Sequence, residues 1–74
     1  SMRAPAPTVK PGWFFRNNRQ YLALSEVPSA LAVSSAEISK AVEAGQIKSE
    51  RVSGCKAVAL EELFRYIEIR GNQK

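Results

Sequence analysis

Few side chains in this sequence could do chemistry, and their types exclude several kinds of active site. The chain has 74 residues with one Cys, no His and no Asp. A lone thiol without imidazole cannot complete a zinc site, and no Ser-His or Cys-His nucleophile pair can form. The adjacent acids Glu61 and Glu62 open an expected helix, where their negative charge interacts favourably with the N-terminal end of the helix dipole. We therefore expect no catalysis, no metal and no other cofactor, and an inert Cys55.

The basic side chains are the remaining candidates for function. The net charge is +4, and it is unevenly placed along the chain. Residues 1–25 hold four basic and no acidic side chains, whereas residues 26–74 hold seven of each. Binding to a nucleic acid would therefore need local clusters of Lys and Arg together with the N-terminal part of the chain.

The best-specified element is a helix over residues 34–44. Ser34 and Glu37 form a capping box, in which each side chain binds a free backbone N–H of the other. Val33 and Ile38 occupy the hydrophobic-staple positions, and Gly45 suits the left-handed position after the helix. Helical periodicity places Ile38, Ala41 and Val42 on one face and sets the following residues on or beside the other: Ser35, Ala36, Ser39, Lys40 and Glu43.

Two further helices and a hairpin are expected around this helix. A helix over 25–32 has Ser25 as its N-cap and Pro28 in its first turn, with Val27 and Leu31 facing the core. Strands 47–52 and 55–59 flank a Ser53-Gly54 turn and carry Lys48, Arg51 and Lys56, which are expected to form one local positive cluster and are candidate DNA-binding residues. The basic pair Arg51 and Lys56 either contacts DNA or protects an edge strand. The last helix, 60–69, is expected to bury Leu60, Leu63, Phe64 and Ile67, to leave Ile69 on its outer face and to end at Gly71.

The N-terminal quarter divides into an arm and an aromatic hairpin. Residues 1–12 contain Pro and small residues and predict a flexible arm, followed by a domain over 13–70 and a tail over 71–74. Residues 13–24 suggest a hairpin turning at Asn17-Asn18. Its aromatic cluster either covers the core or makes a dimer or DNA-proximal contact: Trp13, Phe14 and Phe15. Arg16 and Arg19 flank the turn and either touch phosphate or belong to a soluble loop.

The stretch YLALSEV…AVSSAEISKAVEAGQIKSERVSGCKAVALEELFRYI resembles the excisionase and MerR-like winged helix-turn-helix families. The resemblance implies a small α+β domain in which helix 34–44 enters the major groove and the 47–59 wing follows the DNA backbone. Ser34, which opens that helix, matches the family's turn serine. The remaining matched positions are Ser35, Ala36, Ser39 and Lys40 on the reading face and Arg51 and Lys56 on the wing.

These observations predict a cytoplasmic, non-catalytic protein that binds double-stranded DNA, without a membrane segment or small-molecule ligand. The resemblance implies an architectural factor for site-specific recombination, as in phages and mobile elements, or a small transcriptional regulator. An integrase or further copies of the chain on DNA are its expected partners. The alternative is a protein-interaction module, for example in a phage or plasmid assembly, with an apolar surface around Trp13, Phe14, Phe15 and Ile69.

Overall fold

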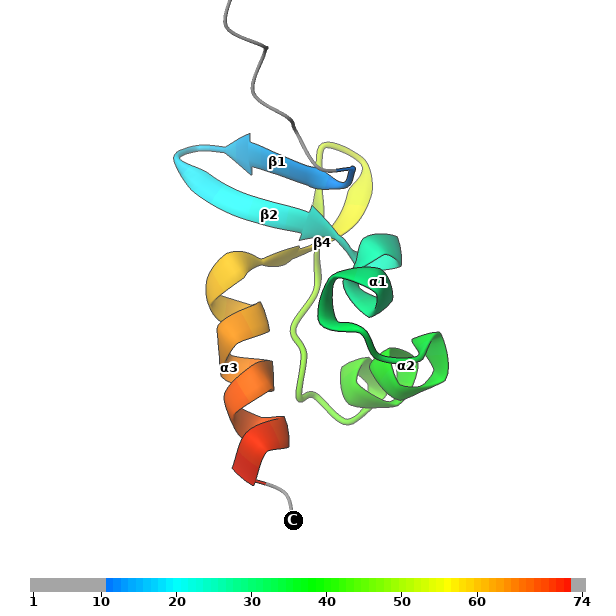
Figure 1. Cartoon of the computed structure of the whole chain (residues 1–74). Helices are drawn as coiled ribbons and strands as arrows, with labels where there is room; N and C mark the ends of the chain where they lie inside the picture. The colour runs from blue at the N-terminus through cyan, green and yellow to red at the C-terminus, as the bar shows by residue number, and fades with distance from the viewer. Residues whose placement is uncertain (1–10, 73–74) are drawn as a thin grey trace, which may run out of the picture.

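Two hairpins supply the four strands that the structure describes (Figure 1). In the computed structural model, which describes residues 11–72, the first hairpin joins β1 (Trp13–Arg16) to β2 (Arg19–Ala23). The second joins β3 (Glu50–Val52) to β4 (Cys55–Ala59). The predicted flexible arm lies almost entirely outside the described residues.

The two hairpin turns share one backbone geometry. Asn17 and Asn18 have φ of 50° and 63°, and Ser53 and Gly54 have φ of 51° and 80°. Positive φ at both turn residues matches the right-handed twist of paired strands, which is why Asn and Gly are favoured there. Both turns predicted from the sequence are confirmed.

β3 is shorter than the predicted strand 47–52 because the residues before it bond elsewhere. The Ile47 N–H donates to the Ala41 carbonyl at 3.3 Å, and the Lys48 N–H donates to Glu62 Oε1 at 3.1 Å. These groups are therefore lost to the ladder, and pairing with β4 begins only at Glu50, opposite Ala57.

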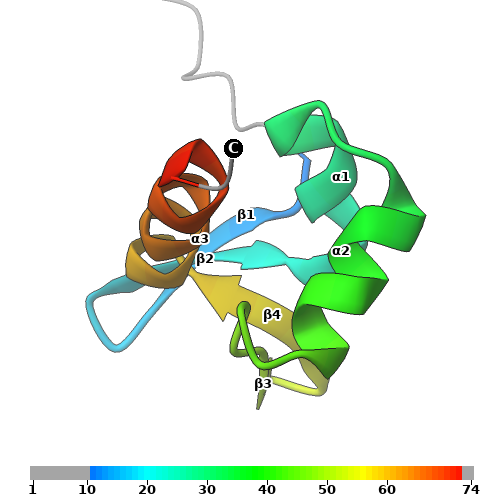
Figure 2. The ribbon, with the colours of Figure 1, turned by 90° about the horizontal axis from the view of Figure 1, so that it is seen from below.

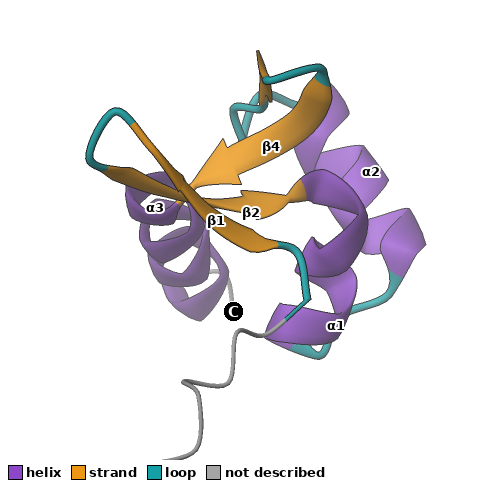
Figure 3. Cartoon of the chain, turned by 90° about the horizontal axis from the view of Figure 1, so that it is seen from above, coloured by secondary structure: helices purple, strands orange, loops and turns teal. Residues whose placement is uncertain are grey.

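The strands form an antiparallel sheet in the order β1-β2-β4-β3. Helices α1 (Val27–Leu31), α2 (Ser35–Glu43) and α3 (Leu60–Asn72) all lie on one face of it, as Figures 2 and 3 show from opposite sides. We call this the inner face and the other the outer face. The domain is thus a small α+β fold of one sheet and one helical layer.

A main core fills the space between the inner face and the helices. Leu22 of β2 and Val58 of β4 are partners across the sheet, and both are fully buried. Val27, Ile38 and Ile47 complete this centre from the helical side. Trp13 packs against it from β1, so this aromatic residue covers the core as the sequence suggested.

A smaller apolar cluster lies on the outer face. Phe14 stacks on Tyr21 with 5.6 Å between ring centroids, and Val52, Ala57 and Ala59 are buried with them. Of the three aromatic residues at 13–15, only Phe15 is largely free, with 73% of its surface exposed.

Gly12 holds the start of β1 close to the first helical turn. Its carbonyl accepts a hydrogen bond from the Ala23 N–H at 2.8 Å, and its φ is 88°. A Cβ at this position would lie 2.5 Å from Cγ of Glu26. Only glycine combines this backbone conformation with so close an approach.

α1 begins later than the sequence predicted. Residues Leu24–Glu26 form a short 3-10 turn, η1, and α1 itself starts at Val27 with Pro28 in its first turn. The predicted N-cap role of Ser25 is wrong: its exposed side chain makes no cap hydrogen bond, because the preceding 3-10 turn moves the helix start. The turn to α2 passes through Ala32 in the left-handed region, with φ of 55°.

α2 follows its predicted boundaries closely. Ser34 Oγ accepts the Glu37 N–H at 3.1 Å, which confirms the N-cap. At the other end, the Gly45 N–H bonds to the Val42 carbonyl and the Gln46 N–H to the Ala41 carbonyl. With Gly45 at φ of 77°, this is the Schellman arrangement that ends a helix.

The buried face of α3 differs from the predicted one. Leu63 and Tyr66 are its buried residues, whereas Phe64 is 59% and Ile67 46% exposed. The prediction that Phe64 and Ile67 are buried is therefore wrong. The Tyr66 hydroxyl donates to Glu37 of α2 at 3.4 Å. The face of α3 that meets α2 therefore includes a polar group, which a pattern of apolar residues does not predict.

The end of α3 also differs from the expectation. The helix continues through Gly71 to Asn72, and Ile69 is half-buried within it. Gly71 does not end the helix, and Ile69 is not a fully outward residue.

Candidate nucleic-acid interface

The exposed face of α2 presents short hydrogen-bonding groups and one long cation. Ser35, Ala36, Ser39, Lys40 and Glu43 are all exposed, as their helical spacing predicted. The predicted site residue Ser34 is also exposed, but its oxygen already serves the helix cap. Apart from the cap, this face can offer hydroxyl, ammonium and carboxylate groups to a ligand.

An open groove of about 700 Å³ separates α2 from the second hairpin. Ser35 and Ser39 line it from α2, and Lys56 lines it from β4. Its remaining lining is largely apolar and comes from η1, α1 and α2: Leu24, Pro28, Ile38 and Val42. The fold thus brings two predicted helix residues and one predicted hairpin residue to one site.

The basic pair of the second hairpin faces the same side of the sheet. Arg51 and Lys56 are direct partners across β3 and β4. Residues two apart on a strand share a face, so both lie on the same side as Val58, the inner face. Arg51 Nη1 donates to the Gly54 carbonyl at 3.1 Å, which ties its side chain to the turn.

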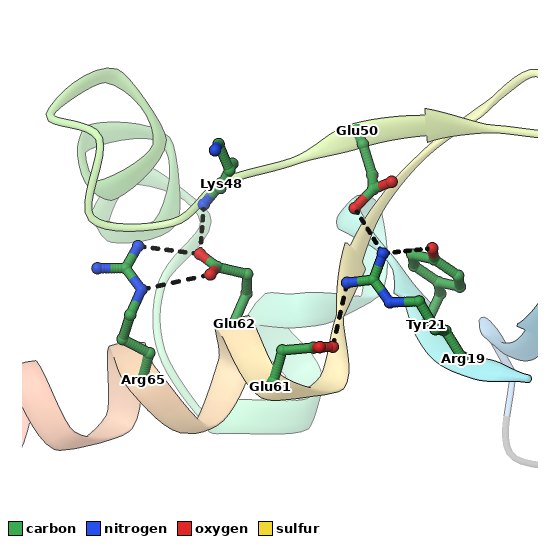
Figure 4. A network of polar contacts seen from close by, with 7 residues as sticks. All are labelled: Arg19, Tyr21, Lys48, Glu50, Glu61, Glu62 and Arg65. Carbon is green, nitrogen blue, oxygen red and sulfur yellow. Dashed lines mark hydrogen bonds and ion pairs between the residues drawn. The ribbon is translucent and has the colours of Figure 1, made fainter.

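Lys48 stands apart from this pair. It precedes β3 and borders a separate hollow with Glu62 and Arg65 of α3. Arg65 Nη2 lies 2.9 Å from Glu62 Oε1, and the Lys48 N–H binds the same carboxylate (Figure 4). The Arg65 hydrogen bond, helped by the Lys48 N–H, lowers the pKa of Glu62. The exposed ammonium of Lys48 is available, but not in the groove.

Arg19 lies on the outer face and is held by several groups of the domain. Its guanidinium is 3.3 Å from Glu61, 3.9 Å from Glu50 and 3.2 Å from the Tyr21 hydroxyl (Figure 4). The hydrogen bond and charge of Glu61 are the main reasons that its pKa is raised. The residue therefore joins the first hairpin to β3 and α3.

Arg16 shares the outer face with Arg19, its direct strand partner. Its Nη1 donates to Ser53 Oγ at 2.6 Å, in the turn of the second hairpin. Both first-hairpin arginines thus make contacts within the domain instead of belonging to a free loop, and neither borders the groove beside α2.

The acids of the described residues form ion pairs with some cations and leave others without a partner. Within residues 11–72 they are Arg19–Glu50, Arg19–Glu61, Arg65–Glu62 and Arg70–Glu37. No ion pair in this part of the chain involves Lys40, Lys48, Arg51 or Lys56. The domain is close to neutral in sequence, yet the cations of α2 and the second hairpin carry uncompensated charge. Glu43 is the acid that lines the groove beside them.

The contacts of Glu37 were missed by sequence reasoning. The predicted return bond of the capping box, from Glu37 to the Ser34 N–H, is wrong: the Glu37 carboxylate instead accepts Arg70 Nε at 2.6 Å and the Tyr66 hydroxyl. Burial and then the charge of Glu37 raise the pKa of Tyr66. These partners are 33 and 29 residues away, so no local spacing could indicate them. The i,i+3 spacing of Glu62 and Arg65, by contrast, is a local signal for their ion pair.

Cys55 is exposed at the start of β4 and lines the groove. Its thiol lies 3.4 Å from the Lys56 carbonyl. Residues 11–72 bring together no group of three or more potential metal ligands. The same residues contain no helix with the length and apolar character needed to cross a bilayer.

Comparison with known proteins adds no relative: no family model, no curated protein and no solved structure matches this chain.

Proposed function

We propose that this protein binds double-stranded DNA as a small winged helix-turn-helix domain. In this proposal α1 and α2 form the helix-turn-helix, α2 enters the major groove, and the β3–β4 hairpin is the wing on the backbone. The order of helix, tight turn, helix, hairpin and helix supports it, together with the resemblance between residues 21 and 67 and the excisionase and MerR-like families.

The observation that carries the proposal is the position of the uncompensated cations. Arg51 and Lys56 share one face of the wing, and Lys56 lies across a groove from Ser35 and Ser39. None of the described acids forms an ion pair with Lys40, Arg51 or Lys56. Salt screens the interaction between charges that are more than about 10 Å apart. Phosphates of a duplex therefore respond to a nearby cluster of cations even when the domain has little net charge.

The exposed groups on α2 suit short-range reading of bases. Serine hydroxyls hydrogen-bond to several base edges, the Lys40 ammonium favours guanine, and a carboxylate such as Glu43 accepts from cytosine. Ala36 can contact a thymine methyl group. The proposal therefore assigns recognition to α2 and most of the charge-dependent affinity to the wing.

The biological role that fits best is architectural or regulatory. A non-catalytic DNA-binding domain of this size serves site-specific recombination beside an integrase, or controls transcription. Both roles need DNA binding, and they differ in the partner protein that meets the domain on DNA.

The test is fluorescence anisotropy with labelled duplexes at several salt concentrations. We expect affinity to fall steeply as salt rises, because bound phosphates release counterions. Lys40→Ala should weaken binding to a selected site more than to random duplex, whereas an equal loss on both would move Lys40 to a phosphate contact. Affinity that is absent or insensitive to salt would reject the proposal.

A second candidate function is protein interaction, and one observation favours it. Phe15, Phe64 and Ile67 are exposed by 73%, 59% and 46%. The surface differs from the predicted one, because Trp13 and Phe14 pack on the two cores and Ile69 is half-buried. Sedimentation of wild type and Phe64→Ser would test it: a wild-type oligomer that Phe64→Ser converts to monomer supports this candidate, and a wild-type monomer opposes self-association.

A further inference from the structure

Two arginines from different strands hold the wing turn, Ser53-Gly54. Arg51, on β3, donates to the Gly54 carbonyl at 3.1 Å from within the same hairpin. Arg16, at the end of β1, donates to Ser53 Oγ at 2.6 Å and is 37 residues away in the sequence. The Arg16 contact therefore links the first hairpin directly to the tip of the wing.

The wing has few other anchors at this end. Among the strands of residues 11–72, β3 is an edge strand of three residues that pairs with β4 alone. Ser53 holds a φ of 51°, a conformation that costs energy for residues other than glycine. A contact that crosses from β1 to this turn restrains both the backbone of Ser53 and the direction of the hairpin.

Arg16 and the wing cations lie on opposite faces of the sheet. Arg16 is on the outer face, whereas Arg51 and Lys56 are on the inner face with the groove and α2. A duplex seated against α2 and the inner face of the wing meets Arg51 and Lys56 directly. Arg16 can influence that contact through Ser53.

We propose that Arg16 is a positioning residue for DNA binding: its hydrogen bond to Ser53 fixes the wing in the orientation in which Arg51 and Lys56 meet the backbone. This inference rests on the proposed function. It differs from a phosphate contact by Arg16, because a positioning residue acts through its partner and adds no counterion release of its own.

A double-mutant cycle on DNA affinity separates these roles. Arg16→Ala and Ser53→Ala should each weaken binding by about threefold to tenfold, the worth of one hydrogen bond, and the double variant should be no weaker than either. The slope of log affinity against log salt should stay at the wild-type value. Ser29→Ala, an exposed serine on α1, is the matched control and should bind as wild type.

Two results would overturn the proposal. A slope that falls by about 0.9 in Arg16→Ala, with Ser53→Ala unchanged, would make Arg16 a phosphate contact. A double variant whose loss of DNA affinity equals the product of the two single losses would also overturn it, because the two residues would then act independently.

A measurement without DNA keeps this inference distinct from the proposed function. Backbone ¹⁵N relaxation should show faster motion of Ser53 and Gly54 in Arg16→Ala than in wild type, while the amides of Asn17 and Asn18 keep their order. Unchanged motion at the wing turn would overturn the anchoring. If the wild type fails to bind DNA, the proposed function falls, and this relaxation result still decides whether Arg16 anchors the wing.

Discussion

The two hairpins have the same turn geometry and carry two cations each, yet they use these cations differently. Each has a two-residue turn with positive φ at both positions, and each carries two basic side chains near it. In β1–β2, Arg19 meets Glu50 and Glu61, and Arg16 meets Ser53. In β3–β4, the acids of the described residues leave Arg51 and Lys56 without ion pairs.

This difference teaches that the sign and number of charges in a segment do not identify a binding surface. Arg19 lies on the central strand β2, where Glu50 of β3 and Glu61 of α3 are close enough to satisfy its charge. In the second hairpin, Arg51 lies on the inner face of the edge strand β3, and its partner Lys56 on β4 borders an open groove. The first hairpin is therefore expected to support the fold, and the second to contact DNA.

The largest expected effect comes from the buried centre of the first hairpin. Leu22→Ala should destabilise the domain by about 2–5 kcal/mol, because it leaves a cavity where a fully buried side chain packs. Phe15→Ala, in the same hairpin but largely exposed, should change stability by less than about 0.5 kcal/mol. Urea denaturation of both variants is the measurement. Equal effects would mean that the first hairpin is not part of the core.

The next effect tests the start of α2. Ser34→Ala should cost about 1 kcal/mol, because the Glu37 N–H loses its partner. The matched control is Ser35→Ala, whose exposed serine lies one residue into the helix and should be neutral or slightly stabilising. Thermal denaturation compares the two. A lower midpoint for Ser35→Ala than for Ser34→Ala would show that Ser34 is not the N-cap.

A smaller effect sharpens the contrast between the hairpins. Arg19→Ala should lower the thermal midpoint, since Arg19 joins the first hairpin to Glu61 and Glu50. Lys56→Ala should leave the midpoint nearly unchanged, because its ammonium has no ion-pair partner among the described residues. A midpoint that falls more for Lys56→Ala would reverse the roles given to the two hairpins.

The smallest expected effect concerns the carboxylate beside Lys48. The pKa of Glu62 is lowered in the folded state, mainly by Arg65, so ionised Glu62 stabilises the fold. That contribution is complete above the ordinary Glu value of about 4.3 and is lost as the pH falls through the lower folded-state pKa. Glu62→Gln should thus be less stable than wild type at neutral pH and similar to it in acid. A stability gap that is constant with pH would contradict this role.

Local chemistry predicted much of the fold. The Ser34 cap, the glycine after α2 and the two hairpin turns depend on a few neighbouring residues, and the structure has them where the sequence placed them. The start of α1 differs because a 3-10 turn precedes it, which Ser25 gives no sign of.

The remaining errors concern contacts between distant segments. Phe64 and Ile67 are more apolar than Tyr66, yet α3 buries Tyr66, whose hydroxyl donates to Glu37, which in turn accepts from Arg70. The ion-pair partners of Arg19 and the hydrogen-bond partner of Arg16 likewise come from residues more than 30 positions away. Sequence spacing identified the cations, whereas only the fold shows which of them keep a free charge.

The most direct test is the salt dependence of DNA binding by the two hairpins side by side. The slope of log affinity against log salt is measured for wild type, for Arg51→Ala with Lys56→Ala, and for Arg19→Ala. We predict that the wing double variant flattens the slope by about 1.8, the worth of two phosphate contacts, and that folded Arg19→Ala keeps the wild-type slope. A wing variant with the wild-type slope, or a flattened slope in Arg19→Ala alone, would contradict the assignment of DNA binding to the second hairpin.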